Sequence, residues 1–246
     1  MTKIKTRISK SSKNSRIILA NDYSSVNTKI VSQTIKNIKT MHKFLCGIKL
    51  NFHVLLPLGK KEIIKINKTA HQYGLLTIAD IKLNDIGNTN QITSKTLWNF
   101  GFDAIIINPI MGPKAIRKIV TEAHKRNKGV IALCHMSAPE AKASYEINVK
   151  LSKNSKTKPL YQLFLKWVIS SGVDGIIVVA TYPKIIKYCK KVSGKKLDIY
   201  SPGIGTQGGS VKKAITNGSD FLIVGRTILG SKNPARTAKQ LLSASS

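Results

Sequence analysis

Residues 75–85 decide the fold of this 246-residue chain, and they are Leu75-Leu76-Thr77-Ile78-Ala79-Asp80-Ile81-Lys82-Leu83-Asn84-Asp85. The first five form a largely apolar run that predicts a buried strand. Side chains on a strand alternate between its faces, so Asp80 and Lys82 should point the same way, with Asp85 just past the strand. Charged groups at the mouth of a buried strand are costly to desolvate unless they pair or act on a ligand. We therefore expect chemistry here.

Apolar runs of the same kind recur along the chain on both sides of this segment. We predict eight strands, over residues 16–21, 46–51, 75–81, 104–108, 130–134, 175–179, 197–200 and 221–224. Amphipathic stretches between them predict helices over residues 25–44, 60–73, 89–100, 113–126, 160–171, 183–192 and 234–242. Eight strands alternating with helices indicate an α/β fold, a single-domain (β/α)₈ TIM barrel with a parallel sheet. An open doubly wound sheet is the alternative, and it would need the strand order to reverse.

Two parts of the chain lack this alternation. Residues 1–15 are rich in Lys, Ser and Thr with little apolar pattern, which predicts a flexible basic arm before a barrel domain over residues 16–246. Residues 137–158 form the longest connection without a clear strand pattern. We expect this connection to hold an extra short helix or a mobile loop at the active site.

The charge balance is extreme, with 41 Lys and Arg against 11 Asp and Glu and a formal net charge of +30. Such an excess affects solubility, steering and non-specific binding rather than fold, and it should attract anionic small molecules such as phosphate esters. The lysines are scattered, and no recognised nucleic-acid motif or stripe of alternating basic and aromatic residues accompanies them. We expect no specific nucleic-acid partner, and a basic nucleic-acid-binding protein is the less favoured alternative.

The cysteines and the lengths of the apolar runs indicate the cellular compartment of the protein. The three cysteines are odd in number and lack a C-x-x-C pair, which argues against a disulfide framework or a thiolate zinc site and fits a reducing cytoplasm. The basic N-terminus lacks the apolar core of a secretory signal, and no apolar stretch is long enough to span a bilayer. The five histidines show no metal-ligand spacing. We expect a soluble cytoplasmic protein with no membrane partner and no metal.

Polar residues gather where the predicted strands end. The active sites of parallel barrels lie at the C-terminal ends of the strands. The polar residues at these ends are Asp22, Lys49, Asp80, Lys82, Asn108, Ser137 and Arg226. Asp22 alone could cap the next helix, and Asp80 with Lys82 could be a plain ion pair. Lys49 should point into the barrel, where a lysine needs a partner. The placement of all these polar residues at the C-terminal end of one barrel favours an active site there.

A glycine-rich segment follows the seventh predicted strand. Residues 201–209 are Ser-Pro-Gly-Ile-Gly-Thr-Gln-Gly-Gly, and the eighth strand ends in Val224-Gly225-Arg226. Glycines let the backbone approach a ligand closely and aim several N–H groups at one anion. Loops after strands seven and eight form the common phosphate site of this barrel class. The two segments therefore predict a phosphate-binding end, with a flexible turn beside a surface arginine as the alternative.

Taken together, these features resemble the orotidine 5′-phosphate decarboxylase family. The resemblance rests on the D-x-K-x-x-D pattern at Asp80, Lys82 and Asp85, together with Asp22, Lys49, the 201–209 loop and the Val-Gly-Arg triplet, in matching order from residue 16 to 235. It implies that orotidine 5′-phosphate loses CO₂ to give uridine 5′-phosphate, the last step of de novo pyrimidine synthesis. It also implies that no metal or organic cofactor takes part, and that the active unit is a homodimer with shared active sites.

The resemblance implies four catalytic residues. Lys82 would deliver a proton to C6, Asp80 would lie beside the substrate carboxylate, Lys49 would pair with Asp80, and Asp85 would reach into the partner subunit's site. Loss of CO₂ leaves negative charge on an sp² carbon with no conjugated sink, so a cation is needed where that charge develops. The alternation of Lys49, Asp80, Lys82 and Asp85 would let four buried charges neutralise one another.

The resemblance also implies the substrate-binding residues. Asp22 and Lys49 would contact the ribose, Thr89 would reach the partner subunit's site, and Ser137 would contact the pyrimidine ring. Gln207, Gly225 and Arg226 would hold the phosphate while the 203–209 loop closes over it. The remaining substrate-binding residue implied by the resemblance is Pro202.

The nearest rival is a sister enzyme of the same barrel class, a magnesium-dependent sugar-phosphate decarboxylase or hexulose-phosphate synthase. These enzymes share the D-x-K-x-x-D pattern but hold the metal with an acid late in the second strand. Lys49 occupies that place here and would repel a metal. The chain departs from the family pattern at Asn21, where an apolar residue is usual, and at Asn108-Pro109, where a histidine is common.

Overall fold

The computed structural model describes residues 15–23, 29–150 and 156–245. Residues 1–14 of the predicted basic arm and residues 25–28 of the first predicted helix lie outside these ranges. Ser15, at the end of the predicted arm, is buried. Its hydroxyl donates to the Phe44 carbonyl at 2.7 Å and accepts from the Ile17 N–H at 3.0 Å. The packed structure therefore includes at least this last residue of the arm.

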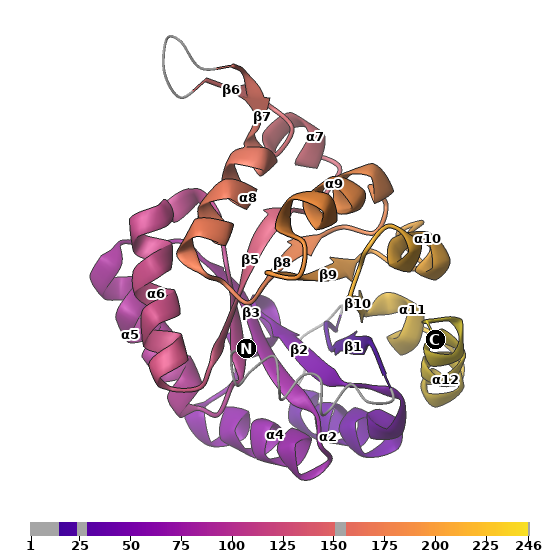
Figure 1. Cartoon of the computed structure of the whole chain (residues 1–246). Coiled ribbons are helices and arrows are strands. Elements are labelled where there is room, and N and C mark those ends of the chain that lie inside the picture. The colour runs from indigo at the N-terminus through magenta and orange to yellow at the C-terminus, as the bar shows by residue number, and fades with distance from the viewer. Residues whose placement is uncertain (1–14, 24–28, 151–155, 246) are drawn as a thin grey trace.

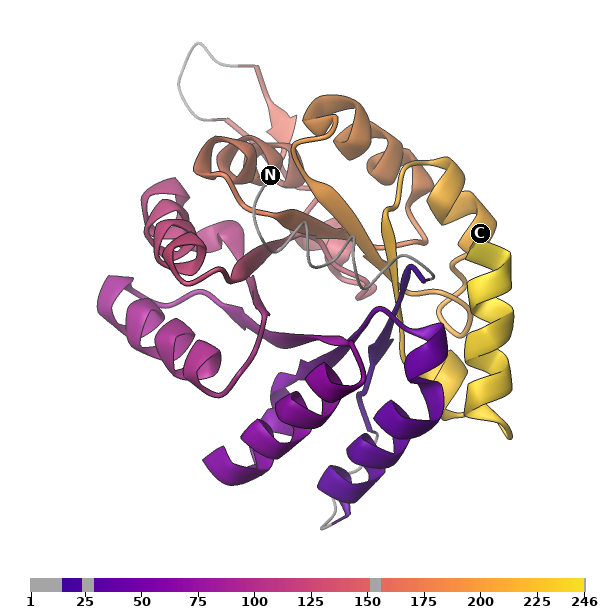
Figure 2. The same ribbon diagram turned by 60° about the horizontal axis from the view of Figure 1, so that its bottom comes forward.

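Eight parallel strands close into a barrel, and the helices surround it (Figures 1 and 2). The strands are β1 (Ile17–Ala20), β2 (Gly47–Asn51), β3 (Leu76–Leu83), β4 (Ala104–Ile107), β5 (Gly129–His135), β8 (Gly175–Val178), β9 (Asp198–Pro202) and β10 (Phe221–Val224). Each pairs with its neighbours in chain order, and β1 pairs with β10 to close the ring. Their apolar side chains are buried, as the runs predicted. The predicted barrel is confirmed, and the open sheet is excluded because each of the eight strands has a neighbour on both edges, so the sheet has no free edge.

The outer layer consists of amphipathic helices that turn their apolar side toward the strands. They are α2 (Ile30–Met41), α4 (Lys60–Gln72), α5 (Gly87–Asn99), α6 (Pro113–Lys125), α8 (Leu160–Ser171), α9 (Pro183–Ser193), α10 (Val211–Thr216) and α12 (Pro234–Ser245). In α6 the buried residues are Ile116, Ile119, Val120 and Ala123, the spacing of one helical face. None of the helices in the described ranges is both long and apolar enough to cross a bilayer.

Short helical turns occupy several loops, and the sequence did not predict most of them. They are η2 (His42–Phe44), α3 (Phe52–Leu55), η3 (Pro109–Met111), α7 (Ala141–Ser144) and α11 (Arg226–Leu229). A segment of three or four residues is too short to display a helical period, so the pattern carries no signal for them.

The long connection after β5 contains the predicted short helix, α7, and a feature that was not predicted. β6 (Asn148–Val149) and β7 (Lys158–Pro159) form a two-stranded antiparallel hairpin. The hairpin projects from the barrel beside α8 (Figure 1). Backbone hydrogen bonds join its base to the start of α8, from the Leu160 N–H to the Ile147 carbonyl and from the Tyr161 N–H to the Tyr145 carbonyl, both at 2.9 Å.

A repeated Gly-x-Asp triplet, at 101–103, 172–174 and 218–220, ties helices to strands at the end of the barrel where strands begin. Each aspartate precedes one strand and accepts a backbone N–H from the neighbouring strand. It also meets a basic side chain from the helix that precedes this neighbouring strand. The backbone pairs are Asp103 with Thr77, Asp174 with Val130, and Asp220 with Ile199. The side-chain pairs are His71–Asp103 at 2.8 Å, His124–Asp174 at 3.1 Å and Lys190–Asp220 at 2.8 Å.

Tyr200 fills this same end of the barrel interior. Its ring stacks on Phe221 with centroids 4.9 Å apart, and it lies over Gly175, the first residue of β8. A Cβ atom on Gly175 would lie 2.4 Å from the Tyr200 Cε2 atom and 2.7 Å from the Asp198 carbonyl oxygen. The barrel closes around an aromatic ring that only glycine can accommodate at this position.

Replacement of Gly175 by alanine should therefore destabilise the fold by overpacking, by about 1–3 kcal/mol in the free energy of unfolding. Chemical denaturation measures this change in the free energy of unfolding. Gly87→Ala is the matched control, because no atom lies within 4 Å of the added methyl group there. Equal stability of the two variants would contradict the packing argument.

Candidate active site

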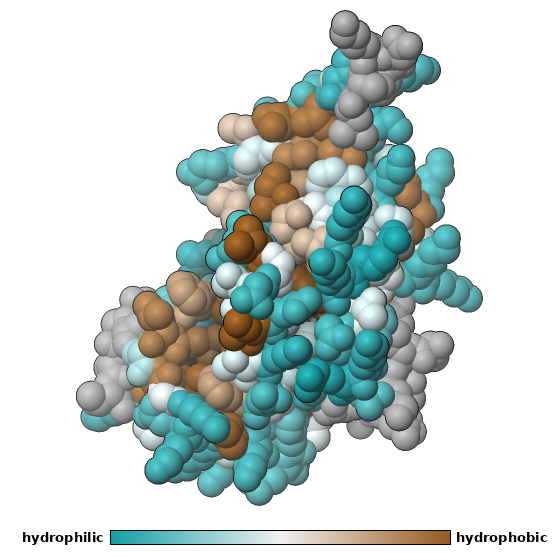
Figure 3. Space-filling view, turned by 90° about the vertical axis from the view of Figure 1, so that its left-hand side faces the viewer, coloured by the Kyte–Doolittle hydropathy of each residue, from teal (hydrophilic) through white to brown (hydrophobic). Residues whose placement is uncertain are grey.

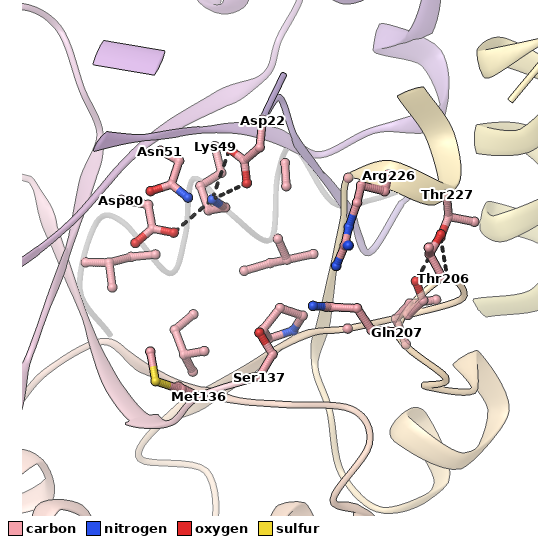
Figure 4. A pocket seen from close by; sticks show the side chains of 18 of the residues that line it. Asp22, Lys49, Asn51, Asp80, Met136, Ser137, Thr206, Gln207, Arg226 and Thr227 are labelled. Atoms are coloured by element: carbon pink, nitrogen blue, oxygen red, sulfur yellow. Dashed lines mark hydrogen bonds and ion pairs between the residues drawn. The ribbon is translucent and has the colours of Figure 1, made fainter. Parts of the chain in front are cut away.

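A cavity of about 410 Å³ opens at the C-terminal ends of the strands. Nine of the eleven residues predicted for the site line it (Figure 4). They are Asp22, Lys49, Asp80, Lys82, Ser137, Pro202, Gln207, Gly225 and Arg226. The predicted rim is therefore a single pocket, built from segments that are distant in sequence.

Four charged side chains form an alternating row along one wall of this cavity. The Lys49 Nζ lies 2.8 Å from Asp80 Oδ2 and 3.1 Å from Asp22 Oδ2. The Lys82 Nζ lies 2.8 Å from Asp80 Oδ1. Lys49 is 4% exposed and Asp80 is 7% exposed, so the centre of the row is shielded from water. Each buried charge meets at least one opposite charge, which is what makes its burial tolerable.

The charges of the row shift the pKa values of its two central groups, Asp80 and Lys49. Burial alone would raise the pKa of the Asp80 carboxyl, but the ammonium groups of Lys49 and Lys82 outweigh it and hold that pKa below its usual value. Burial would lower the pKa of the Lys49 ammonium, but Asp80 and Asp22 reverse the effect and raise that pKa. Both central groups are therefore charged at neutral pH.

The backbone at Lys82 departs from a regular strand. Its φ is +46°, in the left-handed region, and the pairing of β3 with β4 shifts register between Asp80 and Leu83. Strand alternation predicted that Asp80 and Lys82 share a face, and they do meet, but Lys82 reaches Asp80 from a bulge. A lysine at positive φ is strained, and bulges beside active sites commonly re-aim a side chain.

Asp85 and Thr89, the other two predicted residues, lie outside the cavity. Both are exposed. The Asp85 Oδ1 accepts the Ile86 N–H at 2.6 Å, and the Asp85 N–H donates to Asn90 Oδ1 at 3.0 Å. Within one chain the row consists of Asp22, Lys49, Asp80 and Lys82, and the expectation that Asp85 reaches the partner subunit's site stays a prediction.

Gln207 and Arg226 stand at the opposite end of the cavity from Asp80. Gln207 comes from the loop after β9, and Arg226 is the first residue of α11, after β10. Their polar ends point into the same part of the pocket (Figure 4). An amide N–H₂ group and a guanidinium that converge in this way are suited to an anion.

Several lining residues were missed by the sequence reasoning, including Tyr23, Asn51, Met136 and Thr227. Asn51 lies beside Asp80 on the cavity wall, and its Oδ1 accepts the Phe52 N–H at 2.7 Å (Figure 4). A signal for it existed, because Asn51 stands two residues after Lys49 on the same strand and so shares its face.

Asn21, which stands where an apolar residue is usual, supports the pocket wall from behind. Its side chain is fully buried. Its Nδ2 donates to Thr34 Oγ1 at 2.8 Å, and its Oδ1 accepts from Asn37 Nδ2 at 2.9 Å and from the Tyr23 hydroxyl at 3.3 Å. Both polar atoms of the side chain therefore have partners, and the network holds Tyr23 against the cavity.

The described residues contain no group of three or more His, Cys, Asp or Glu arranged to hold a metal ion. The two carboxylates on the cavity wall, Asp22 and Asp80, are both engaged by Lys49. An ammonium group thus occupies the position between acids that a divalent cation would need.

Comparison with known proteins points to one family. The model of the Orotidine 5′-phosphate decarboxylase / HUMPS family matches residues 15–241. A Pyrococcus abyssi protein named orotidine 5′-phosphate decarboxylase is 32% identical over 198 residues, 80% of this chain and 86% of that protein. A Methanosarcina acetivorans protein of the same name is 29% identical over 209 residues, 85% of this chain and 87% of that protein.

Solved structures agree. The crystal structure of orotidine 5′-phosphate decarboxylase from Pyrococcus horikoshii OT3 matches with a TM-score of 0.75 and 28% identity, covering 93% of this chain and 98% of that one. The enzyme from Methanocaldococcus jannaschii, complexed with the inhibitor BMP, matches with a TM-score of 0.78 at 24% identity, covering 93% and 96%. The second likeness supports the fold alone.

The ion row predicts how stability depends on pH. A carboxyl whose pKa is lowered by folding contributes stability that is complete above its unfolded pKa of about 4 and is lost as pH falls through the folded pKa. The free energy of unfolding should therefore fall below about pH 4 in the wild type. Lys49→Met should remove much of this dependence, because Asp80 loses its main partner. It should also cost about 3–5 kcal/mol at pH 7 by leaving a buried carboxylate poorly paired.

Denaturation measured from pH 2 to 8 checks this expectation. Lys65→Met, which removes an exposed lysine from α4, is the matched control and should behave as the wild type does. An unchanged pH profile in Lys49→Met would show that the row does not set the stability.

Proposed function

The chain belongs to the orotidine 5′-phosphate decarboxylase / HUMPS family, and from that membership we propose that it converts orotidine 5′-phosphate to uridine 5′-phosphate and CO₂. The observation that carries the proposal is the alternating row of Asp22, Lys49, Asp80 and Lys82 on the wall of a pocket that ends at Gln207 and Arg226. The row is suited to a carbanion, and the far end is suited to a phosphate.

Lys82 supplies the proton. When the bond between C6 and the carboxylate breaks, its electron pair stays on C6, and the resulting carbanion takes a proton from the Lys82 ammonium. A cation that is already in place stabilises the developing charge without reorganisation of solvent. Asp80, 2.8 Å away, holds that ammonium in position.

Asp80 and Lys49 prepare the site before substrate arrives. The Asp80 carboxylate stays ionised and would face the substrate carboxylate, an interaction that ends when CO₂ leaves. Ground-state repulsion of this kind is a weaker argument than transition-state stabilisation, so the larger share of catalysis belongs to Lys82. Lys49 prevents Asp80 from gaining a proton, since it is the closest cation on its buried side.

The remaining pocket residues bind parts of the substrate remote from C6. Asp22 and Lys49 face the ribose hydroxyls, Ser137 meets the pyrimidine ring, and Gln207 with Arg226 holds the phosphate. Pro202 and Gly225 complete the binding wall. Binding energy from the phosphate orients the base at Lys82 and helps to exclude water, so it lowers the barrier although it touches no reacting atom.

The sister sugar-phosphate enzymes are not favoured by the geometry. They would need a divalent cation among acids on this rim, and Lys49 takes that position between Asp22 and Asp80. A cofactor-independent reaction is the one that a row of neutralised charges supports.

Purified protein mixed with orotidine 5′-phosphate in EDTA should therefore show the ultraviolet absorbance change of decarboxylation. Lys82→Ala should lower kcat by at least about 100-fold, because the proton donor is lost, and should still bind uridine 5′-phosphate. Absence of turnover in folded wild-type protein, or turnover only with added magnesium, would reject the proposal in favour of the sugar-phosphate reaction.

We propose a homodimer with shared sites, and the surface around Asp85 supports it. Asp85 and Thr89 are exposed on the rim although the family pattern includes Asp85. Ile86 beside them is 74% exposed, and Ile110 in the next rim loop is 54% exposed. Figure 3, which faces the α5 and α6 side, shows hydrophobic patches among the charged surface. Exposed isoleucines next to a charged residue that lacks a role in its own pocket favour a second copy of the chain.

Shared sites predict complementation between two inactive variants. Lys82→Ala and Asp85→Ala should each be inactive alone, whereas their co-expression should restore about one quarter of wild-type activity, because half of the dimers are hybrids with one intact site. Lys82→Ala with Lys49→Ala is the control pair. Both residues belong to one subunit's pocket, so no activity should return. Failure of the first pair to recover would exclude a contribution of Asp85 across the interface.

A further inference from the structure

One hydroxyl joins the two segments of the phosphate end. The Thr227 Oγ1 accepts the Thr206 N–H at 3.0 Å, lies 3.0 Å from Thr206 Oγ1, and donates to the Ile204 carbonyl at 2.9 Å (Figure 4). A threonine hydroxyl has one hydrogen and two lone pairs. All three are engaged here, with Thr206 as the donor in the contact between hydroxyls. Thr227 thus has no hydrogen-bonding capacity left for a ligand, although it lines the cavity.

The loop otherwise bonds mainly to itself. The Gly205 N–H donates to the Gly209 carbonyl and the Gly209 N–H to the Gly203 carbonyl, both at 2.9 Å. The loop base is held by the Ala180 N–H, which donates to the Pro202 carbonyl at 2.8 Å. Among the hydrogen bonds of the described residues, those that reach residues 204–206 from outside the loop all come from Thr227.

The loop backbone also packs tightly on Thr227. Gly205 has a φ of +74°, and a Cβ atom there would lie 2.4 Å from Thr227 Oγ1 and 2.8 Å from its Cγ2. Only glycine fits so close to this side chain, so both the hydrogen bonds and the packing fix the loop against α11.

The contact between Thr227 and Thr206 also positions the residues next to them in the chain. Arg226 and Thr227 are consecutive residues of α11, and Thr206 and Gln207 are consecutive residues of the loop. A bond between Thr227 and Thr206 therefore sets the separation of Arg226 from Gln207, the two side chains that converge on the end of the cavity (Figure 4). Two donors held at a fixed separation bind an anion with less loss of conformational freedom than two independent ones.

We propose that Thr227 is a positioning residue, whose hydroxyl latches the 203–209 loop to α11 and so presets the phosphate-binding gap between Gln207 and Arg226. The proposal rests on the proposed function for the identity of the ligand, a nucleoside 5′-monophosphate. The latch itself is a property of the chain and can be measured without turnover.

Thr227→Val and Thr227→Ser separate the hydroxyl from the methyl group. Valine keeps the shape and loses the hydrogen bonds, so KM for orotidine 5′-phosphate and the inhibition constant of uridine 5′-phosphate should rise about tenfold. Inhibition by uridine, which lacks the phosphate, should change less than about twofold because its contacts lie at the other end of the pocket. Serine keeps the hydroxyl and should stay near the wild type in every measurement.

Hydrogen exchange of the 203–209 segment supplies a readout that does not depend on activity. The Thr206 amide should exchange faster in Thr227→Val than in the wild type and Thr227→Ser, while the melting temperature changes little. Equal exchange in all three proteins would overturn the latch, as would an equal loss of affinity for uridine and uridine 5′-phosphate, which is the result of a general packing defect. If wild-type protein failed to turn over orotidine 5′-phosphate, the proposed function would fail, and exchange would still decide the latch.

Discussion

The buried ion pair between Lys49 and Asp80, 2.8 Å long, is the constraint on which the rest of the site depends. Neither charge can be buried alone, so β2 and β3 must bring the two together, and Asp22 after β1 completes the neutralisation. The same carboxylate holds Lys82, whose backbone leaves the strand conformation to reach it. Three neighbouring strand ends are therefore fixed relative to one another by charge before any ligand is present.

The closed barrel brings this charged wall next to the phosphate end although the two are far apart in sequence. β1 pairs with β2 on one edge and with β10 on the other, so Asp22 lies between the strand that carries Lys49 and the strand that precedes Arg226. A substrate with a reacting carbon at one end and a phosphate at the other can span the mouth of the barrel. The proposed proton transfer and the proposed phosphate binding thereby fall on different walls, and the latch that we propose at Thr227 belongs to the second.

The sequence was sufficient for features that depend on local pattern. Apolar runs located all eight barrel strands, and polar residues at their ends located six residues of the cavity, while the resemblance to the family added Pro202, Gln207 and Gly225. It failed where contacts are long-range or the backbone is irregular. The bulge at Lys82 has no compositional signal. The histidine partners of the Gly-x-Asp triplets lie 32 and 50 residues from their aspartates, beyond the reach of any local period.

The positive charge of the chain follows from its small number of acids, 11 against 41 Lys and Arg, and most of these acids stand at specific contacts. Seven of the eleven acidic side chains contact a basic side chain, which is a lysine for Asp22, Asp80, Asp103, Glu122 and Asp220 and a histidine for Glu146 and Asp174. Glu62 accepts the Gly59 N–H at the start of α4, and Asp85 accepts the Ile86 N–H, so two more stabilise local backbone. Acids thus stand largely where a specific contact needs them, and the remaining surface is left to lysine. The net charge of +30 raises the concentration of anionic ligands near the protein.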